Sequence, residues 1–297
     1  MWIRRVALKA LQRLAEPIEG ETSSGATTHH LTIAGQQRWY ELYVPPACVL
    51  KTPAPLILAF HGATSTPKQF AYISQLSRRG GETGYVVAYP AAHQGFWSPT
   101  PGGTDIAFVD AVLDDVAAKI ALDPARIFGA GISNGGQMVY RLACERSNRI
   151  AAIAACACGM SLGECRPQRA VPVIHFHGTT DTFVSYMWGV DAVNRWRDIN
   201  HCESVASETY RNGNAICRTY KDSSGVADVT LCTVEGMGHQ WPGVAIRMSE
   251  HEAKLLGLPV ILSRLGPGTD DLDATGMLLS FFSSHPIQPL REDASKT

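Results

Sequence analysis

Residues 126–143 read RIFGAGISNGGQMVYRLA, and the order of residue types along this stretch predicts a strand, a tight turn and a helix. Arg126–Ala130 is a short run typical of a buried strand, whereas Asn134–Arg146 has the spacing of an amphipathic helix. Between them, two glycines bracket Ser133 in a Gly-x-Ser-x-Gly pattern. Because glycines permit a sharp turn and close backbone approach, the pattern predicts a serine presented at the end of a strand.

The same five-residue pattern occurs a second time, around Ser161. It also follows an apolar run, but Glu164–Pro167 comes next and leaves no helix before the following strand. Since the pattern alone is weak evidence, the strand–turn–helix context decides in favour of Ser133. A dinucleotide-binding interpretation of Gly129–Gly131 fails, because the third glycine would fall at Asn134 and no acidic residue follows about 20 positions on.

Apolar runs alternate with helical segments along most of the chain. Further strands are expected at Leu56–Phe60, Tyr85–Tyr89, Ile150–Cys158, Val171–Phe176 and Val229–Val234, and further helices at Phe70–Arg79, Ile106–Leu122, Val190–Asn200 and Asp271–Ser283. This alternation indicates an α/β fold, with a mostly parallel central sheet and helices on both faces. Leu31–Ala34 and Trp39–Val44 predict a hairpin that gives the sheet an antiparallel N-terminal edge.

Length and composition fit one globular domain. The chain has 297 residues, 45% hydrophobic and 18% charged, with a formal net charge of −1. The absence of a basic excess argues against nucleic-acid binding, and no run approaches the ~20 apolar residues of a transmembrane helix. We expect a single domain over residues 26–290 and a disordered tail at residues 291–297. Residues 1–25 are expected to form an amphipathic segment, in which Lys9 and Arg13 interrupt the apolar stretch that a signal peptide needs.

The eight cysteines show no Cys-x-x-Cys pair and no other zinc-site spacing, so no metal site is expected. Their number favours disulfides, and hence an oxidising compartment, without indicating which cysteines pair. Cys156 and Cys158 alternate along an apolar run and are candidates for buried free thiols.

A serine hydroxyl becomes a good nucleophile only when a base takes its proton and a carboxylate orients that base. When the serine lies on a strand–helix elbow, the acid and then the histidine follow it in the chain. The candidate bases in that order are His201, His239, His251 and His285. We select His239, because it lies in a glycine-bracketed loop directly after Val229–Val234, whereas the others fall at helix ends or in a polar segment.

Asp181 is the predicted acid, because it follows the apolar strand Val171–Phe176 and lies between the serine and the histidine in the chain. Acyl transfer also needs donors for the oxyanion, usually two backbone N–H groups. We predict the amides of Asn134, directly after the nucleophile, and of Ala63, in the loop after an early strand, with Thr64 as the second choice. His61 and His177, which precede glycines at strand ends, are interpreted as structural.

Together these residues resemble the polyhydroxybutyrate-depolymerase-like esterases, a group that includes bacterial feruloyl and acetyl-xylan esterases. The matching segments are Phe60–Gly62, Gly131–Gly136, His175–Asp181, Leu231–Gly243 and Asp271–Thr275. The resemblance implies the α/β-hydrolase fold, a serine esterase with a triad of Ser133, Asp181 and His239, and no cofactor. It also implies a secreted or periplasmic protein that acts on small-molecule or polymeric esters, although no convincing signal peptide is present.

The resemblance also bears on the substrate. Trp97 and Trp241 are expected to line an aromatic acyl or sugar subsite, with Thr64 and Gln240 beside them. Depolymerase members tend to carry cysteine directly after the His-Gly of the oxyanion loop, where this chain has Ala63. The expected activity is therefore of the feruloyl, acetyl-xylan or small-ester type, with polyester depolymerase as the alternative.

Two further functions stay open. A serine peptidase would use the same residues on an amide. A non-catalytic α/β-hydrolase-like binding protein is the alternative outside the enzymes, and such a protein usually loses a triad member, whereas all three positions here hold competent residues.

Overall fold

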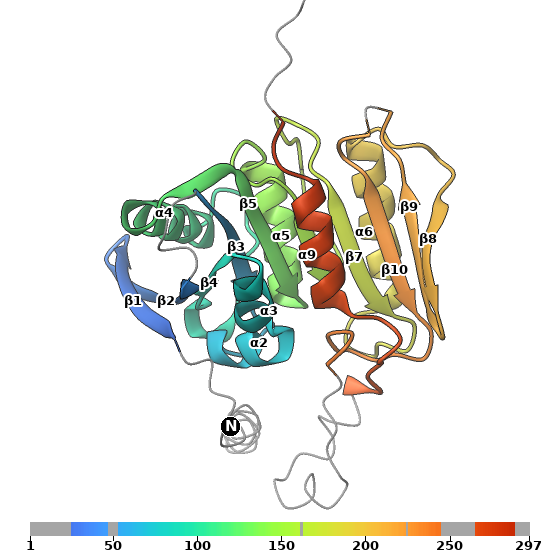
Figure 1. The fold of residues 1–297 in the computed structure, drawn as a ribbon, viewed down its shortest axis with the longest axis horizontal. Helices are drawn as coiled ribbons and strands as arrows, with labels where there is room; N and C mark the ends of the chain where they lie inside the picture. The colour runs from blue at the N-terminus through green and yellow to red at the C-terminus, as the bar shows by residue number, and fades with distance from the viewer. Residues whose placement is uncertain (1–24, 47–52, 161–162, 224, 245–264, 289–297) are drawn as a thin grey trace, which may run out of the picture.

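The computed structural model describes residues 25–46, 53–160, 163–223, 225–244 and 265–288 (Figure 1). These residues form a ten-stranded sheet in the order β1-β2-β4-β3-β5-β6-β7-β10-β9-β8. The strands are β1 (Ala26–Ile33), β2 (Gln36–Tyr43), β3 (Ala54–Phe60), β4 (Val86–Pro90), β5 (Leu122–Ile132), β6 (Ile153–Cys156), β7 (Val173–Gly178), β8 (Ser207–Asn212), β9 (Ala215–Tyr220) and β10 (Val229–Val234). The expected α/β architecture with a mostly parallel sheet is confirmed.

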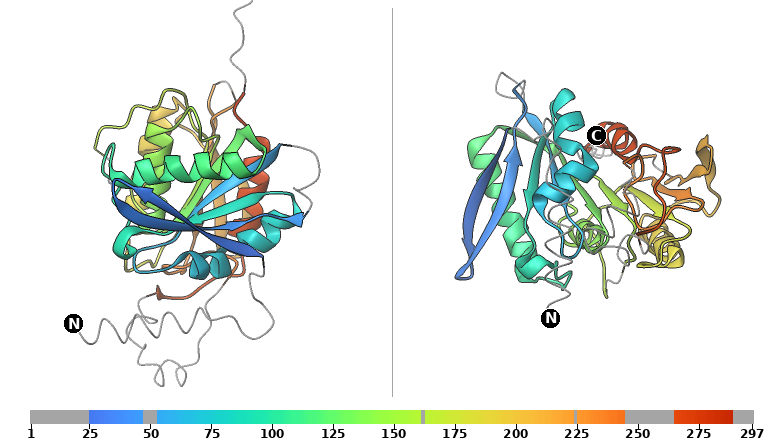
Figure 2. Two further views of the ribbon diagram at one scale, coloured as in Figure 1. Left: turned by 90° about the vertical axis from the view of Figure 1, so that its left-hand side faces the viewer. Right: turned by 90° about the horizontal axis from the view of Figure 1, so that it is seen from below.

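The six central strands, from β4 to β10 in the sheet order, run parallel to one another. Parallel strands covered on both faces are apolar along their whole length, and every residue of β3, β4, β6 and β7 is indeed buried. The carboxyl ends of these strands therefore meet at one edge of the sheet, where polar side chains can gather. The β1–β2 hairpin closes the N-terminal side as an antiparallel edge, as expected (Figure 2, left).

Helices cover both faces of the sheet (Figure 1). They are α2 (Pro67–Ser74), α3 (Leu76–Glu82), α4 (Thr104–Lys119), α5 (Asn134–Glu145), α6 (Tyr186–Ile199) and α9 (Ala274–Ser284), with a short 3-10 turn η2 (His93–Gly95). One apolar core contains side chains of α4, α5 and α6. The other contains side chains of α2, α3 and α9.

The helix predicted at Phe70–Arg79 is wrong in one respect, because the structure has two helices there. Gln75, between α2 and α3, adopts the left-handed conformation with φ 52°. Its N–H still bonds the Ala71 carbonyl and so ends α2. Helical spacing of apolar residues continues across such a break, so the periodicity alone could not locate it.

A second antiparallel edge, the β8–β9 hairpin, was missed by the sequence analysis. Its two-residue turn contains Gly213, which has φ 49°, followed by Asn214, which keeps a negative φ. A glycine with positive φ in the first turn position is typical of a type II′ hairpin. The signal in the sequence was the Gly-Asn pair between two runs rich in threonine, tyrosine and arginine.

Two disulfides support the prediction that cysteines pair. Cys144, in α5, bonds Cys165, and Cys217 of β9 bonds Cys232 of β10. Cys156 and Cys158 are buried free thiols, as expected.

Several predictions fall outside the described residues. They include most of the amphipathic segment at 1–25, the tail at 291–297, and Ser161. Among the described helices, none is long and apolar enough to cross a membrane.

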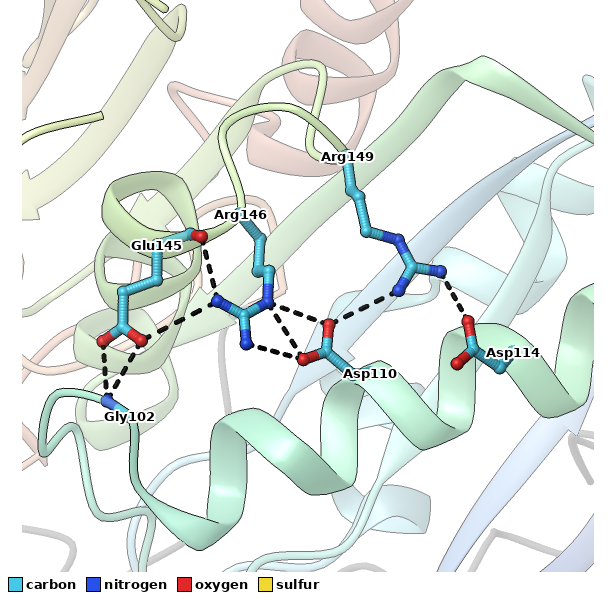
Figure 3. A network of polar contacts seen from close by, with 6 residues as sticks. All are labelled: Gly102, Asp110, Asp114, Glu145, Arg146 and Arg149. Atoms are coloured by element: carbon cyan, nitrogen blue, oxygen red, sulfur yellow. Dashed lines mark hydrogen bonds and ion pairs between the residues drawn. The ribbon is translucent and has the colours of Figure 1, made fainter. Parts of the chain in front are cut away.

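Charged side chains join α4 to the end of α5 (Figure 3). Asp110 accepts hydrogen bonds from Arg146, whose Nη2 lies 2.7 Å from Oδ2, and Arg149 bonds Asp114 at 2.8 Å. Glu145 accepts the Gly102 N–H at 3.1 Å and so holds the loop that precedes α4. Because these side chains are partly exposed, each pair contributes little by itself.

A buried ion pair fixes the start of α4. Arg38 of β2 contacts Asp105 of α4 at 2.8 Å, and both side chains are 3% exposed. The other oxygen of Asp105 accepts the Ser98 N–H at 2.7 Å. Asp105 therefore holds both β2, the inner strand of the N-terminal hairpin, and the loop before α4.

Replacement of Asp105 should be costly, because it leaves the Arg38 guanidinium buried without its counter-charge. We expect Asp105→Ala to lower the free energy of unfolding by about 3–5 kcal/mol. The control is Asp198→Ala, which removes an exposed pair with Arg197 and should cost less than about 1 kcal/mol. Urea unfolding of both variants measures the difference, and equal costs would contradict the assignment.

Candidate active site

Ser133 is the single residue between β5 and α5, and its backbone has φ 56° and ψ −124°. A positive φ is uncommon for a residue with a side chain and is retained only where the surroundings enforce it. Here the Ser133 N–H donates to the Cys156 carbonyl at 2.8 Å, and the Ser133 carbonyl accepts the Gln137 N–H at 3.1 Å. The predicted strand–turn–helix around Ser133 is thus present.

The two glycines beside Ser133 are required by close packing. A Cβ on Gly131 would lie 2.4 Å from the Gly135 carbonyl oxygen, and one on Gly135 would lie 2.2 Å from that of Phe60. The end of β3 thus lies directly against the first turn of α5. A Cβ on Gly62, in the loop that follows β3, would lie 3.5 Å from Ser133 Cβ, so this loop is adjacent to the serine.

Asp181 and His239 are brought together from the ends of two adjacent parallel strands, β7 and β10. His239 Nδ1 lies 2.7 Å from Asp181 Oδ2. Asp181 Oδ1 accepts the amides of Phe183 and Val184 at 2.8 and 2.9 Å. Burial by itself raises the pKa of Asp181, but hydrogen bonds, first from His177 and then from His239, lower it well below its usual value. The carboxylate therefore stays ionised and holds His239 with a proton on Nδ1, which leaves Nε2 free to act as a base.

The His239 loop is tied to the rest of the site by backbone hydrogen bonds. The N–H groups of Gly238 and His239 donate to the carbonyls of Pro267 and Leu265 at 2.8 and 2.5 Å. On the other side, the Cys156 thiol donates to the Gln240 carbonyl at 3.4 Å. Burial raises the pKa of Cys156, so the thiol keeps the proton that it donates.

Cys156 thus contacts both halves of the candidate triad. Its backbone carbonyl accepts the N–H of Ser133, and its thiol bonds the residue after His239. This connection places the serine turn and the histidine loop on either side of the end of β6.

The candidate oxyanion donors lie on the loop after β3 and at the start of α5. Thr64, the second choice, donates its N–H to the Gly95 carbonyl at 2.7 Å and is thereby occupied. Within the described part of the chain, the N–H groups of Ala63 and Asn134 have no such acceptor. The Asn134 side chain is fully engaged, because Oδ1 accepts the Trp97 N–H and Nδ2 donates to the Trp97 carbonyl. Ala63 and Asn134 therefore remain the preferred pair.

Both tryptophans expected to line a substrate subsite are buried. Trp97 is 3% exposed, and its indole N–H donates to the His61 carbonyl at 2.9 Å. Trp241 is 1% exposed, and its indole N–H donates to Thr275 at 3.0 Å. The burial does not support the expected subsite. Trp97 braces the oxyanion loop, and Trp241 belongs to the core that lies under α9.

The two other residues expected at the substrate differ in their exposure. Gln240 is 4% exposed, and its side-chain amide donates to the Gly266 carbonyl at 2.6 Å. It therefore holds the His239 loop against the segment before α9. Thr64 is exposed, so it can still contact a substrate.

Three exposed apolar side chains in the segment after Asp181 were not among the predicted site residues. Phe183, Met187 and Trp188 are 45, 56 and 59% exposed, and the Phe183 ring centroid lies 5.2 Å from that of His239. All three lie within seven residues after Asp181 in the sequence, which was the signal available. An exposed aromatic ring beside a polar catalytic group, as Phe183 is beside His239, is typical of a binding surface.

Comparison with solved structures shows the α/β-hydrolase fold. The acetyl xylan esterase from Aspergillus awamori superposes with a TM-score of 0.58 at 16% identity, over 78% of this chain and 99% of that one. The feruloyl esterase module from Clostridium thermocellum, solved with sinapinate, gives a TM-score of 0.54 at 11% identity, over 77% of this chain and 86% of that one.

Sequence comparison then shows the family. The model of the esterase PHB depolymerase family matches residues 38–187, and the chain belongs to this family. It is 30% identical to the putative esterase NocK of Nocardia uniformis over 76% of this chain and 78% of that protein. It is 29% identical to feruloyl esterase B of Piromyces equi over 63% of this chain but only 39% of that protein. The chain thus matches well under half of this longer relative, and the same holds for a bifunctional acetylxylan esterase/xylanase of Neocallimastix patriciarum, of which 31% is covered.

The two copies of the Gly-x-Ser-x-Gly pattern offer a matched test of the turn. Gly135→Ala introduces a methyl group 2.2 Å from the Phe60 carbonyl, whereas a Cβ at Gly163, in the second copy, meets nothing within 4 Å. We expect Gly135→Ala to lower the free energy of unfolding by about 1–3 kcal/mol or more, since the clash is with backbone. Gly163→Ala should be neutral within about 0.5 kcal/mol in the same urea titration. Equal stability of the two variants would show that the first turn is not the constrained one.

Proposed function

We propose that this protein is a serine carboxylic-ester hydrolase that works through an acyl-enzyme on Ser133. The observation that carries the proposal is the combination at the strand ends: a serine held at positive φ, and a histidine held 2.7 Å from a buried, ionised carboxylate. Membership of an esterase family supports it. Ser133, Asp181 and His239 then act as nucleophile, orienting acid and base.

The reaction proceeds in two steps. His239 Nε2 takes the hydroxyl proton as Ser133 Oγ attacks the ester carbonyl, and the amides of Ala63 and Asn134 stabilise the oxyanion. The tetrahedral intermediate expels the alcohol, which receives its proton from His239. Water then attacks the acyl-serine with His239 again as base, and the carboxylic acid is released. Asp181 stays ionised and stabilises the imidazolium in both steps.

An exposed aromatic side chain beside the triad favours an ester with an aromatic acyl group. Phe183 lies against the His239 ring, so an acyl chain bound at Ser133 would extend beside Phe183. Flat aromatic groups stack well on such rings. Among the activities of relatives, that of feruloyl esterase B fits this surface. Acetyl-xylan-type and small-ester hydrolysis remain the next candidates, followed by polyester depolymerisation.

The disulfides also bear on the location of the protein. Two disulfides in the described residues support an oxidising compartment, because cytosolic thiols are kept reduced. We therefore place the enzyme outside the cytosol, in the periplasm or the medium.

A substrate panel tests the proposed reaction. Wild-type protein should hydrolyse methyl ferulate and p-nitrophenyl acetate and leave a peptide amide intact. Ser133→Ala should lower kcat by at least about 10⁴-fold, because removal of a triad member leaves only binding and the oxyanion donors.

Ser161→Ala is the control and should retain activity. A fluorophosphonate probe should label wild-type protein at Ser133 and leave Ser133→Ala unlabelled. Turnover that survives Ser133→Ala would refute the nucleophile assignment. Wild-type protein that neither turns over esters nor takes the label would favour the non-catalytic alternative, and cleavage of the amide would favour a peptidase.

A second experiment tests the aromatic acyl site. Phe183→Ala should lower kcat/KM for methyl ferulate roughly three- to tenfold, which corresponds to the binding free energy of one aromatic contact. The rate on p-nitrophenyl acetate, whose acyl group ends in a methyl, should stay within about twofold. The control is Val205→Ala, which shortens another exposed apolar residue and should change neither rate. Equal losses on both substrates would refute selective recognition of the acyl group.

A further inference from the structure

Behind Asp181 lies a row of buried polar side chains that the reaction above does not use. The Tyr140 hydroxyl lies 3.0 Å from His175 Nδ1, and His175 Nε2 lies 3.1 Å from His177 Nδ1. His177 Nε2 lies 3.1 Å from the Val184 carbonyl oxygen and 3.4 Å from Asp181 Oδ2. Tyr140, His175 and His177 are all 0% exposed. The row therefore runs from α5 through β7 to the carboxylate, without contact with solvent.

The partners determine where the protons lie. His177 Nε2 faces only acceptors, the Val184 carbonyl and the Asp181 carboxylate, so this nitrogen carries a hydrogen. If the His177 ring is neutral, its Nδ1 carries no hydrogen and accepts a hydrogen bond from His175 Nε2–H. By the same argument His175 Nδ1 carries no hydrogen, and the Tyr140 hydroxyl donates to it. Every hydrogen in the row thus points toward Asp181.

Uncharged forms of His175 and Tyr140 fit the surroundings. Burial lowers the pKa of His175 well below its usual value, with His177 as a further cause, and burial raises that of Tyr140. The other titratable groups that face the row are Cys158, which is buried and free, and Tyr186, whose ring packs edge-on against His177. Neutral rings leave the negative charge of Asp181 for the imidazolium of His239.

The backbone of α6 packs closely against both histidine rings. A Cβ on Gly189 of α6 would lie 2.2 Å from His177 Nδ1 and 2.8 Å from His175 Nε2. The backbone of α6 at Gly189 therefore packs directly over the hydrogen bond between the two rings. The hydrogen bonds of the row fix the tautomer of His177, and packing against α6 fixes the orientation of the same ring.

We propose that His177 is a positioning residue for the triad: its Nε2–H holds the Asp181 carboxylate and the Val184 backbone, and His175 and Tyr140 fix its tautomer. The inference rests on the proposed function, because His177 can position the triad only if Asp181 orients His239 for catalysis. His177 acts on the Asp181 loop twice, since the Val184 that accepts from it also donates its amide to Asp181 Oδ1. No proton moves along the row, which serves only to orient.

Two polar substitutions separate positioning from general stability. In His177→Gln the amide N–H reaches about as far as Nε2, whereas His177→Asn is one methylene shorter and cannot reach Asp181. We expect Asn to lower kcat roughly ten- to a hundredfold, the value of a hydrogen bond to a charged group. Gln should restore kcat to within about threefold of wild type. KM should change little in either, since His177 does not touch the substrate. Equal kcat losses in Gln and Asn would overturn the proposal.

A double-mutant cycle identifies the residue through which His177 acts. If His177 works through Asp181, His177→Asn should cost nothing further in an Asp181→Ala background. A role confined to overall stability would instead cost the same factor in both backgrounds, and that result would refute the inference. Ser133→Ala, measured in parallel, reports on the proposed function separately. If wild type and Ser133→Ala hydrolyse esters equally, the proposed function fails, whereas an unchanged His177→Asn with an inactive Ser133→Ala refutes only the positioning role.

A measurement on the wild-type protein keeps the test independent of whether variants fold. Ring-nitrogen NMR shifts of ¹⁵N-histidine-labelled protein distinguish the tautomers of each ring. We expect His175 and His177 each to carry a proton on Nε2 and none on Nδ1. A protonated His177, or one with its proton on Nδ1, would overturn the assignment.

Discussion

The positive φ of Ser133 is the constraint on which the site depends. It forces β5 to turn directly into α5. Gly131 lets the end of β5 lie against the first turn of this helix, and Gly135 lets the same turn lie against the end of β3. The same contact places the loop after β3 beside the serine, where the amide of Ala63 can serve the reaction. The nucleophile and its oxyanion donors are thus set by backbone packing in the centre of the sheet, before any catalytic side chain is considered.

The base and the acid follow from a second regularity, the parallel arrangement of the strands. Because β7 and β10 are adjacent and point the same way, the residues after them meet at one edge, and Asp181 reaches His239. This explains why chain order and local context were sufficient to predict the pairing of Asp181 with His239. Short segments with one strong local requirement, such as the glycines around Ser133, are predictable because the requirement is visible in the residues themselves.

Other features depend on contacts between distant parts of the chain and were not predictable in this way. Trp97 looked like a pocket wall in a loop rich in glycine and proline, yet its indole N–H finds the carbonyl of His61 and draws the ring inward. Trp241 behaves likewise through Thr275, which is 34 residues further on. Conversely, Phe183 looks like an ordinary core residue in the sequence and is exposed, because it lies in the turn whose amides bond Asp181. The sequence indicates only a structural histidine at His177, because the polar row that it joins depends on the packing of α5 against β7.

The backbone bonds that secure the His239 loop also define a place where the chain can vary. Leu265 and Pro267 accept from His239 and Gly238, and the Gly243 N–H donates to the Thr269 carbonyl at 3.1 Å. These three bonds join residues 238–243 directly to residues 265–269, so the backbone on both sides of residues 245–264 is held at the His239 loop. The entropy of closing a loop grows only slowly with its length. The length of the chain between Gly243 and Leu265 can therefore change at a small entropic cost while these bonds keep the histidine in place, which makes this interval a practical one for grafting.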